Sequence, residues 1–172
     1  MQTSRAAAGS AAFFAVGPGT VLGLIPWLIT RWEIPGSTPI WRVVQVLGVL
    51  LIVAGLMPLV NAFVQFAKAG GTPMPITPTE RLVVTEFNRY VRNPMYVGML
   101  VVLLGQAMLF GSLALLVYAA FLGILAAPVV RWHEEPILVR RYGSEYDTYR
   151  RNVPAWLPRI RPWTPEVADQ SH

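Results

Sequence analysis

Three long tracts without a charged residue constrain this chain more than any other feature of its sequence. They cover residues 6–30, 43–67 and 93–130. A helix needs about 20 apolar residues to cross the hydrocarbon core of a bilayer, so each of the first two tracts fits one crossing. The third fits two short helices separated by a turn at Phe110-Gly111-Ser112, because glycine bends freely and serine caps helices. We predict an all-α, multi-pass transmembrane bundle of about four spans, with the last two forming a tight C-terminal hairpin.

Charged side chains are scarce in the rest of the chain as well. They make up 13% of the residues, hydrophobic residues make up 54%, and the net charge is +5. Soluble domains average about a quarter charged residues, so much of this surface is expected to face lipid. No basic stretch stands apart from the apolar tracts, which favours loops held against anionic lipid headgroups over a nucleic-acid site.

The positions of lysine and arginine predict the orientation of the spans. Basic residues lie between the second and third spans and after the fourth, and the third–fourth turn has none. This places both termini and the middle loop in the cytoplasm, for a protein of the cytoplasmic or inner membrane. We interpret the first tract as a retained span and not a signal peptide, because no small-x-small cleavage site follows it closely.

An amphipathic segment is predicted beyond the last span. The helical pattern continues to Tyr142 and Gly143 ends it, while Ser144 with Asp147 indicates a capping box for the next helix. Apolar side chains at three- and four-residue steps form one stripe: Leu138, Tyr142, Tyr146, Tyr149 and Val153. Arginines occupy the other side, which is typical of an interfacial helix. Residues 153–158 are too rich in proline for a helix and are expected to pack extended across the membrane surface.

Two local features have alternative interpretations. Thr77-Pro78-Thr79-Glu80 favours a helix start, whereas the β-branched run Val83-Val84-Thr85 favours an extended segment. Pro58 and Pro128 lie inside the second and fourth spans, where each removes a backbone hydrogen bond. Their effect is either simple bending or, at Pro128, a kink that opens a cavity.

Polar residues cluster at residues 89–96, before the third span, and at residues 131–135, after the fourth. A fold-back of the last two spans brings both clusters to one membrane face. The resulting pocket offers carboxylates, arginines, aromatic rings and an apolar wall, which suit the ribose, carboxylate and sulfonium of S-adenosylmethionine. In the plainer interpretation these residues anchor the span ends, with Glu134 and Glu135 pairing with arginines. There is no cysteine, and His133 has no second ligand at helical spacing, so no metal site is predicted.

The first cluster carries a family resemblance. Residues 92–98, Arg-Asn-Pro-Met-Tyr-Val-Gly, resemble the Arg-His/Asn-Pro-x-Tyr-x-Gly motif of the isoprenylcysteine carboxyl methyltransferase family, to which phospholipid N-methyltransferases are related. Matching positions follow at Glu134-Glu135, Tyr142-Gly143, Tyr146, Tyr149, Val153-Pro154 and Leu157-Pro158, so the resemblance covers residues 82–158. The family often has Thr-Gly-Pro-Tyr where this chain has Thr85-Glu86-Phe87-Asn88.

The resemblance implies an S-adenosylmethionine-dependent methyltransferase that acts on a lipid-like or prenylated acceptor. It implies a single membrane domain with two variable, substrate-side spans in residues 1–68, a cofactor-binding core in 69–158 and a tail in 159–172. Arg131 and Glu135 are the implied catalytic residues. The implied cofactor-binding residues are Leu82, Val83, Asn88, Tyr90, Arg92, Asn93, Pro94, Met95, Tyr96 and Glu134.

Carboxyl O-methylation is favoured, because a carboxylate acceptor needs only a cation such as Arg131, whereas an amine needs a base. A prenylcysteine protein, a phospholipid amine, an isoprenoid acid and a small hydrophobic metabolite all remain as acceptors. Two other functions fit parts of the pattern. Sterol-type reductases, which use NADPH, share an Arg-x-Pro-x-Tyr … Tyr … Val-Pro pattern, and a non-enzymatic membrane scaffold would explain the departure at residues 86–88.

Overall fold

The computed structural model describes residues 16–36, 38–68, 82, 84 and 86–164. The described residues form helices joined by turns and irregular segments, with no β-strand among them, which confirms the all-α prediction. They group into two compact units. Of the described residues, the first unit contains 16–36, 38–68 and 95–127, and the second contains 82, 84, 86–94 and 128–164.

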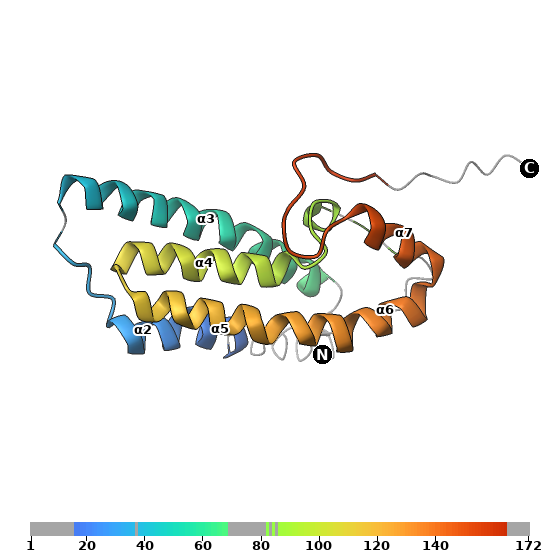
Figure 1. Ribbon diagram of the computed structural model, residues 1–172, viewed down its shortest axis with the longest axis horizontal. Coiled ribbons are helices and arrows are strands. Elements are labelled where there is room, and N and C mark those ends of the chain that lie inside the picture. The colour runs from blue at the N-terminus through green and yellow to red at the C-terminus, as the bar shows by residue number, and fades with distance from the viewer. Residues whose placement is uncertain (1–15, 37, 69–81, 83, 85, 165–172) are drawn as a thin grey trace, which may run out of the picture. The chain divides into compact units, whose positions relative to one another are not determined.

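The helical elements occur in the following order along the chain (Figure 1). Their bounds are η1 (Thr20–Leu24), α2 (Ile25–Thr30), α3 (Pro39–Lys68), η2 (Glu86–Arg89), α4 (Pro94–Phe110), α5 (Leu113–Val129), η3 (Val130–Glu134), α6 (Glu135–Tyr142) and α7 (Ser144–Asn152). Of the short elements, η1 and η3 are π-helical turns and η2 is a 3₁₀ turn.

Two helical stretches are long and apolar enough to cross a membrane, namely Pro39–Ala62 and Leu113–Tyr142. The helices Val16–Thr30 and Pro94–Phe110 are apolar but shorter. A 17-residue helix such as α4 extends about 26 Å at the usual rise per residue, slightly less than the hydrocarbon core. Four spans therefore stay a prediction. Residues 6–15 of the first tract and the helix start proposed at Thr77 lie outside the described residues.

The third apolar tract is interrupted where the sequence predicts. Gly111 follows α4 with a φ of +62°, in the left-handed region that favours glycine. Ser112 then caps α5, since its Oγ accepts the Leu115 N–H at 3.3 Å, which confirms the predicted cap. Further along α5, a Cβ built on Gly123 would meet the Leu100 side chain of α4 at 3.6 Å, an ordinary packing contact.

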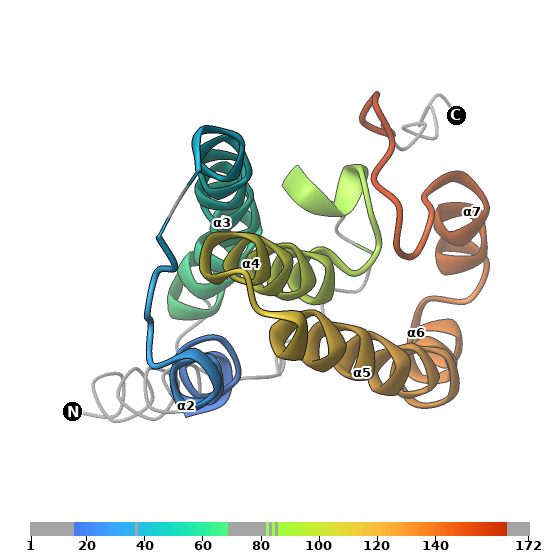
Figure 2. The ribbon, with the colours of Figure 1, turned by 60° about the vertical axis from the view of Figure 1, so that its left-hand side comes forward.

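Four glycines bring α3 and α4 into direct backbone contact, and Figures 1 and 2 show the two helices side by side. A Cβ on Gly48 would lie 2.7 Å from the Gly105 oxygen, and a Cβ on Gly105 would lie 2.5 Å from the Gly48 oxygen. Gly55 and Gly98 form the same reciprocal pair at 2.6 and 2.7 Å. Only residues without a side chain allow backbones to approach this closely. Small residues are common where helices pack against each other in lipid.

Two polar side chains of the first unit, one from α4 and one from α5, donate hydrogen bonds to backbone carbonyls of η1. Pro26 lacks the N–H that would bond to the Leu22 oxygen in an α-helix or to the Val21 oxygen in a π turn. Gln106 Nε2 donates to the Leu22 oxygen at 2.7 Å, and the Tyr118 hydroxyl donates to the Val21 oxygen at 3.3 Å. The two side chains thus satisfy carbonyls that would be costly to leave unpaired in lipid.

A small aromatic cluster forms the core of the second unit. Tyr146, Tyr149 and Val153 are 2%, 5% and 1% exposed. The side chains packed against them are Leu82, Val84, Leu138, Val139, Tyr142 and Trp163. The predicted apolar stripe is therefore present, but its buried members pack against the chain itself and not against lipid. An interfacial position of this segment stays a prediction.

The boundary between α6 and α7 is partly as predicted. Gly143 ends α6 with a φ of +53°. The predicted capping box is wrong, because Gly143 occupies the cap position and no side chain caps α7. Ser144 lies one position too late to cap, and Asp147 instead pairs with Arg150 at 3.1 Å.

Candidate functional site

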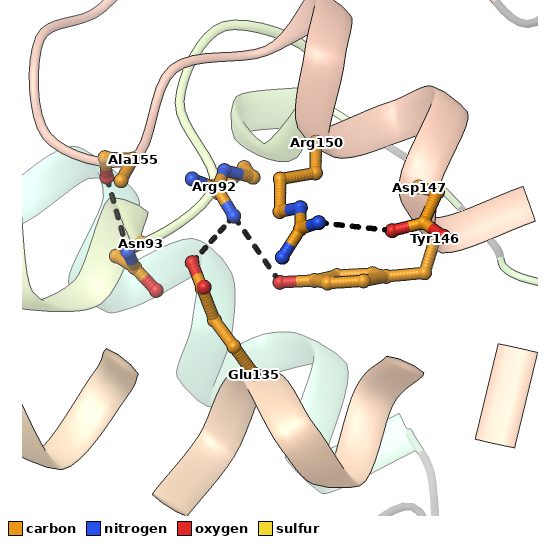
Figure 3. Close-up of polar contacts among 7 residues, drawn as sticks. All are labelled: Arg92, Asn93, Glu135, Tyr146, Asp147, Arg150 and Ala155. Carbon is orange, nitrogen blue, oxygen red and sulfur yellow. Dashed lines mark hydrogen bonds and ion pairs between the residues drawn. The ribbon is translucent and has the colours of Figure 1, made fainter. Parts of the chain in front are cut away.

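An ion pair joins the segment before α4 to the first residue of α6 (Figure 3). Arg92 Nη1 donates to Glu135 Oε1 at 2.5 Å and to the Tyr146 hydroxyl at 3.3 Å. The side chains of Arg92 and Glu135 are only 12% and 17% exposed. Arg92 of the first polar cluster and Glu135 of the second thus meet within the second unit. Of the two interpretations of these charges, ion pairing holds for Glu135.

One hydrogen-bond donor of the Arg92 side chain is unsatisfied among the described residues. Its Nε is buried and has no hydrogen-bond partner among the described residues. Leaving a buried donor unsatisfied costs about 1–3 kcal/mol, and more for a charged group. The Arg92 Nε therefore fits an acceptor atom supplied by a ligand, such as a carboxylate oxygen.

The residues beside Arg92 are held by the chain that follows α7. The Arg92 N–H donates to the Pro154 oxygen at 2.9 Å, and Asn93 Nδ2 donates to the Ala155 oxygen at 3.1 Å. Figure 3 shows the Asn93 amide turned toward Ala155. Pro94 then starts α4, where its missing N–H removes no helical hydrogen bond. The Asn-Pro turn is thus positioned by both its main chain and its side chain.

The two site candidates just before this turn contribute backbone carbonyls. The Tyr149 hydroxyl donates to the Asn88 oxygen at 2.7 Å, and the Arg159 N–H donates to the Tyr90 oxygen at 2.9 Å. Glu86, at the start of η2, has a φ of +46°. This is the left-handed region, which is unfavourable for a residue with a Cβ. The strain falls on the position that matches the glycine of the resembling family's motif.

Arg89 makes contacts that the sequence gave no reason to expect. The Trp163 N–H donates to the Arg89 oxygen at 2.9 Å, Arg89 Nε donates to the Trp163 oxygen at 2.8 Å, and Arg89 Nη2 donates to Thr164 Oγ1 at 2.7 Å. The Trp163 ring lies 5.7 Å from the Tyr149 ring. Residues 163 and 164 therefore belong to the second unit's packed structure, although the resemblance ended at Pro158. An aromatic residue within a proline-rich tail was the only available signal.

The remaining candidates near this core differ in their surroundings. The Leu82 N–H donates to Glu145 Oε2 at 3.0 Å, and the Leu82 side chain packs on the tyrosine cluster. Val83 lies outside the described residues. Leu82 thus has a structural role in the second unit.

The other candidates lie on helices. Arg131 and Glu134 belong to the π turn η3, which begins two residues after Pro128; Arg131 is exposed and Glu134 is half-buried. Met95 and Tyr96, both half-buried, occupy the first turn of α4 and belong to the first unit. π-Helical turns within longer helices are often found at functional sites. Among the described residues, no group of His, Cys, Asp and Glu side chains could hold a metal ion.

Burial raises the pKa of both core tyrosines, which further favours their neutral form. Burial raises the pKa of Tyr149 above its usual 10.0, neighbouring Tyr146 raises it further, and the Arg92 charge opposes the shift. Burial also raises the pKa of Tyr146, against the hydrogen bond from Arg92. Neither phenol is therefore available as a base near neutral pH.

Two curated methyltransferases are similar to this chain in sequence. The chain is 34% identical over 90 residues to the protein-S-isoprenylcysteine O-methyltransferase of Schizosaccharomyces pombe, covering 47% of this chain and 35% of that protein. It is 31% identical over 120 residues to the methanethiol S-methyltransferase of Crocosphaera subtropica, covering 70% of this chain and 44% of that protein. The chain thus spans less than half the length of these curated relatives. No solved structure matches it.

The family resemblance read from the sequence is confirmed. The sequence profile named phospholipid methyltransferase matches residues 43–145. This match covers more than half of the chain and includes the Arg92–Glu135 pair. The chain therefore belongs to the phospholipid methyltransferase family.

Proposed function

We propose that this protein is an integral membrane methyltransferase that takes its methyl group from S-adenosylmethionine and transfers it to a lipid-like or prenylated acceptor. The Arg92–Glu135 pair carries the proposal, because it fixes the Asn93-Pro94 turn next to the helix that holds Glu134. The family membership supports the reaction class. The active site lies on the cytoplasmic face, with both termini cytoplasmic and four spans in the bilayer.

The donor carries a methyl group already activated on a sulfonium, so the protein mainly binds, orients and excludes water. Arg92 Nε, the unsatisfied donor, is suited to the amino-acid carboxylate. Glu134 is suited to the ribose hydroxyls. Met95 and Tyr96, which follow Pro94 in the chain, are the residues proposed for apolar and aromatic contacts with the donor. Glu135 acts through Arg92 as a positioning residue, because its charge is already compensated by the guanidinium.

The proposed acceptor is a carboxylate on an apolar body. Arg131 is exposed at the π turn and provides a cation to hold the carboxylate, which attacks the methyl carbon without prior deprotonation. The relatives are named for O- and S-methylation, so a thiol is the nearest competing acceptor, and an amine requires a base. Neither name indicates a reductase, so the reductase and scaffold alternatives gain no support.

Isothermal titration with S-adenosylmethionine tests the donor and its site. Glu134→Ala and Tyr96→Ala are expected to weaken binding at least tenfold. Asp147→Asn is the matched control, since it removes only a half-exposed ion pair with Arg150. Unchanged binding in both site variants would refute the site assignment, and no binding by the parent protein would refute the proposed function.

The acceptor class is tested by the alkali stability of the transferred label. Membranes containing the protein are incubated with S-adenosylmethionine labelled in its methyl group, and the lipid products are treated with base. A carboxyl methyl ester releases volatile labelled methanol, whereas N-methyl and S-methyl products retain the label. Retained label would rule out carboxyl methylation while leaving the methyltransferase proposal intact.

A further inference from the structure

The chain after α7 forms a loop with two strongly exposed large apolar side chains, Leu157 and Ile160. Leu157 is 79% exposed and Ile160 is 97% exposed, the highest values among the large hydrophobic side chains of the second unit. Single exposed apolar residues are common on protein surfaces, so exposure alone indicates little. The informative feature is that the backbone of this loop is fixed in place.

Hydrogen bonds hold the loop at both ends and in the middle. The bonds are Asn93 Nδ2 to the Ala155 oxygen at 3.1 Å, the Arg159 N–H to the Tyr90 oxygen at 2.9 Å, Arg159 Nη1 to the Asn152 oxygen at 2.6 Å, and the Trp163 N–H to the Arg89 oxygen at 2.9 Å. Turning Leu157 or Ile160 inward would break several of these bonds. The apolar side chains are therefore presented to the surroundings by a preformed backbone.

The composition of the loop indicates what it contacts. Residues 153–164 contain two arginines and no acidic residue, and exposed Arg161 follows Ile160 directly. Pro158 and Pro162 have no N–H, which lowers the number of backbone donors that would need partners in an apolar phase. Apolar side chains flanked by arginine are typical of segments that lie at the surface of an anionic bilayer.

We propose that Leu157 and Ile160 insert into the boundary between headgroups and acyl chains of an anionic bilayer, with Arg161 beside the lipid phosphates. This docks the second unit on the membrane surface and holds its Asn-Pro turn at the depth of the headgroups. The exposed face of α7 around Thr148, which includes Glu145, Arg151 and Asn152, is polar and faces water. The inference depends on the membrane location and not on the methyl donor.

Because the chain has no cysteine, single nitroxide labels can be placed without background. The variants are Leu157→Cys, Ile160→Cys and, as control, Thr148→Cys, each in the full chain reconstituted into nanodiscs of phosphatidylcholine with phosphatidylglycerol. Labels at 157 and 160 are expected to collide several-fold more often with oxygen than with a water-soluble nickel complex. The label at 148 is expected to show the reverse ratio. Adding Arg161→Gln is expected to reduce the immersion of the label at 160.

Two outcomes would overturn the proposal. In the first, the labels at 157 and 160 are as accessible to the nickel complex as the control. In the second, they are shielded from both reagents, which would place a protein surface over the loop, from a second copy or another chain. Circular dichroism of each variant confirms that the helices are intact, which is expected because the replaced side chains are exposed.

Discussion

Arg92 and Glu135 lie 43 positions apart in the sequence, and a contact of 2.5 Å joins their side chains in a largely buried setting. Removing one partner leaves the other charge buried and uncompensated. We expect Glu135→Leu to lower the stability of the second unit by about 3 kcal/mol. Thermal unfolding in detergent measures this change.

A double variant separates the effect of breaking this ion pair from the effect of removing charged residues in general. Replacing both residues, as Arg92→Met with Glu135→Leu, is expected to recover most of the stability, because apolar pairs often substitute for buried ion pairs. The exposed Asp147–Arg150 pair is the control, and its loss is expected to cost less than about 1 kcal/mol. Equal losses for the buried and exposed pairs would contradict this view of the site.

The strained backbone at Glu86 predicts a stabilising substitution. Glu86→Gly removes the Cβ that makes a φ of +46° unfavourable, a gain of about 1 kcal/mol that glycine's greater freedom in the unfolded chain partly offsets. Glu86→Ala loses the carboxylate but keeps the Cβ, so it isolates the backbone effect. We expect a higher melting temperature for the glycine variant than for the alanine variant. The reverse order would contradict the strain.

The close approach of α3 and α4 predicts intolerance to a single methyl group. A Cβ at position 105 would lie 2.5 Å from the Gly48 oxygen, so Gly105→Ala forces the helices apart at a cost of about 1–3 kcal/mol. Gly123→Ala is the control, since its Cβ would meet Leu100 at an ordinary 3.6 Å. Unfolding in mixed micelles compares the two, and equal stability would show that the helices are not in backbone contact.

The contacts of Arg89 predict where the chain can be shortened. Truncation after Thr164 keeps all three Arg89 hydrogen bonds, whereas truncation after Pro158 removes them together with the Trp163 ring. We expect the shorter chain to lose affinity for S-adenosylmethionine and the longer one to retain it. Titration of both proteins measures the difference. Equal affinities would show that the tail does not position the site.

The buried phenol of Tyr149 predicts a loss of stability at alkaline pH. Its pKa is raised above the usual 10.0, so above that pH the unfolded chain ionises while the folded chain does not. The contribution is therefore complete below pH 10 and falls as pH rises through and beyond that value. Absorbance at 295 nm follows tyrosinate formation. Tyr149→Phe is expected to weaken the pH dependence in this range.

Helices and their ends could largely be predicted from the sequence, because they depend on local periodicity and on glycine or proline. The interruption at Gly111 and the end of α6 at Gly143 are examples. The predicted Ser144 cap was wrong because the cap position is shifted by one residue, a detail that local pattern does not resolve. The π turns were also missed, since they depend on backbone register.

Within the site, the sequence predicted that the two polar clusters meet, and the ion pair of Arg92 and Glu135 confirms this for one residue of each cluster. The partner of Arg89 could not be predicted. Trp163 lies 74 positions away, and no periodicity connects the two. Long-range contacts of this kind depend on tertiary packing. Long-range hydrogen bonds, such as that from Asn93 to the Ala155 oxygen, also hold the Asn-Pro turn in place.

The reciprocal glycine pairs have a consequence for how an acceptor enters. Where main-chain atoms of α3 touch those of α4, no space remains for an acyl or prenyl chain. The contact is closed along about two helical turns, from Gly48 to Gly55. We therefore expect the proposed lipid-like acceptor to pass along another side of the first unit, so that bulky probes crosslinked from the lipid phase label α2 or α5 and spare the α3–α4 contact.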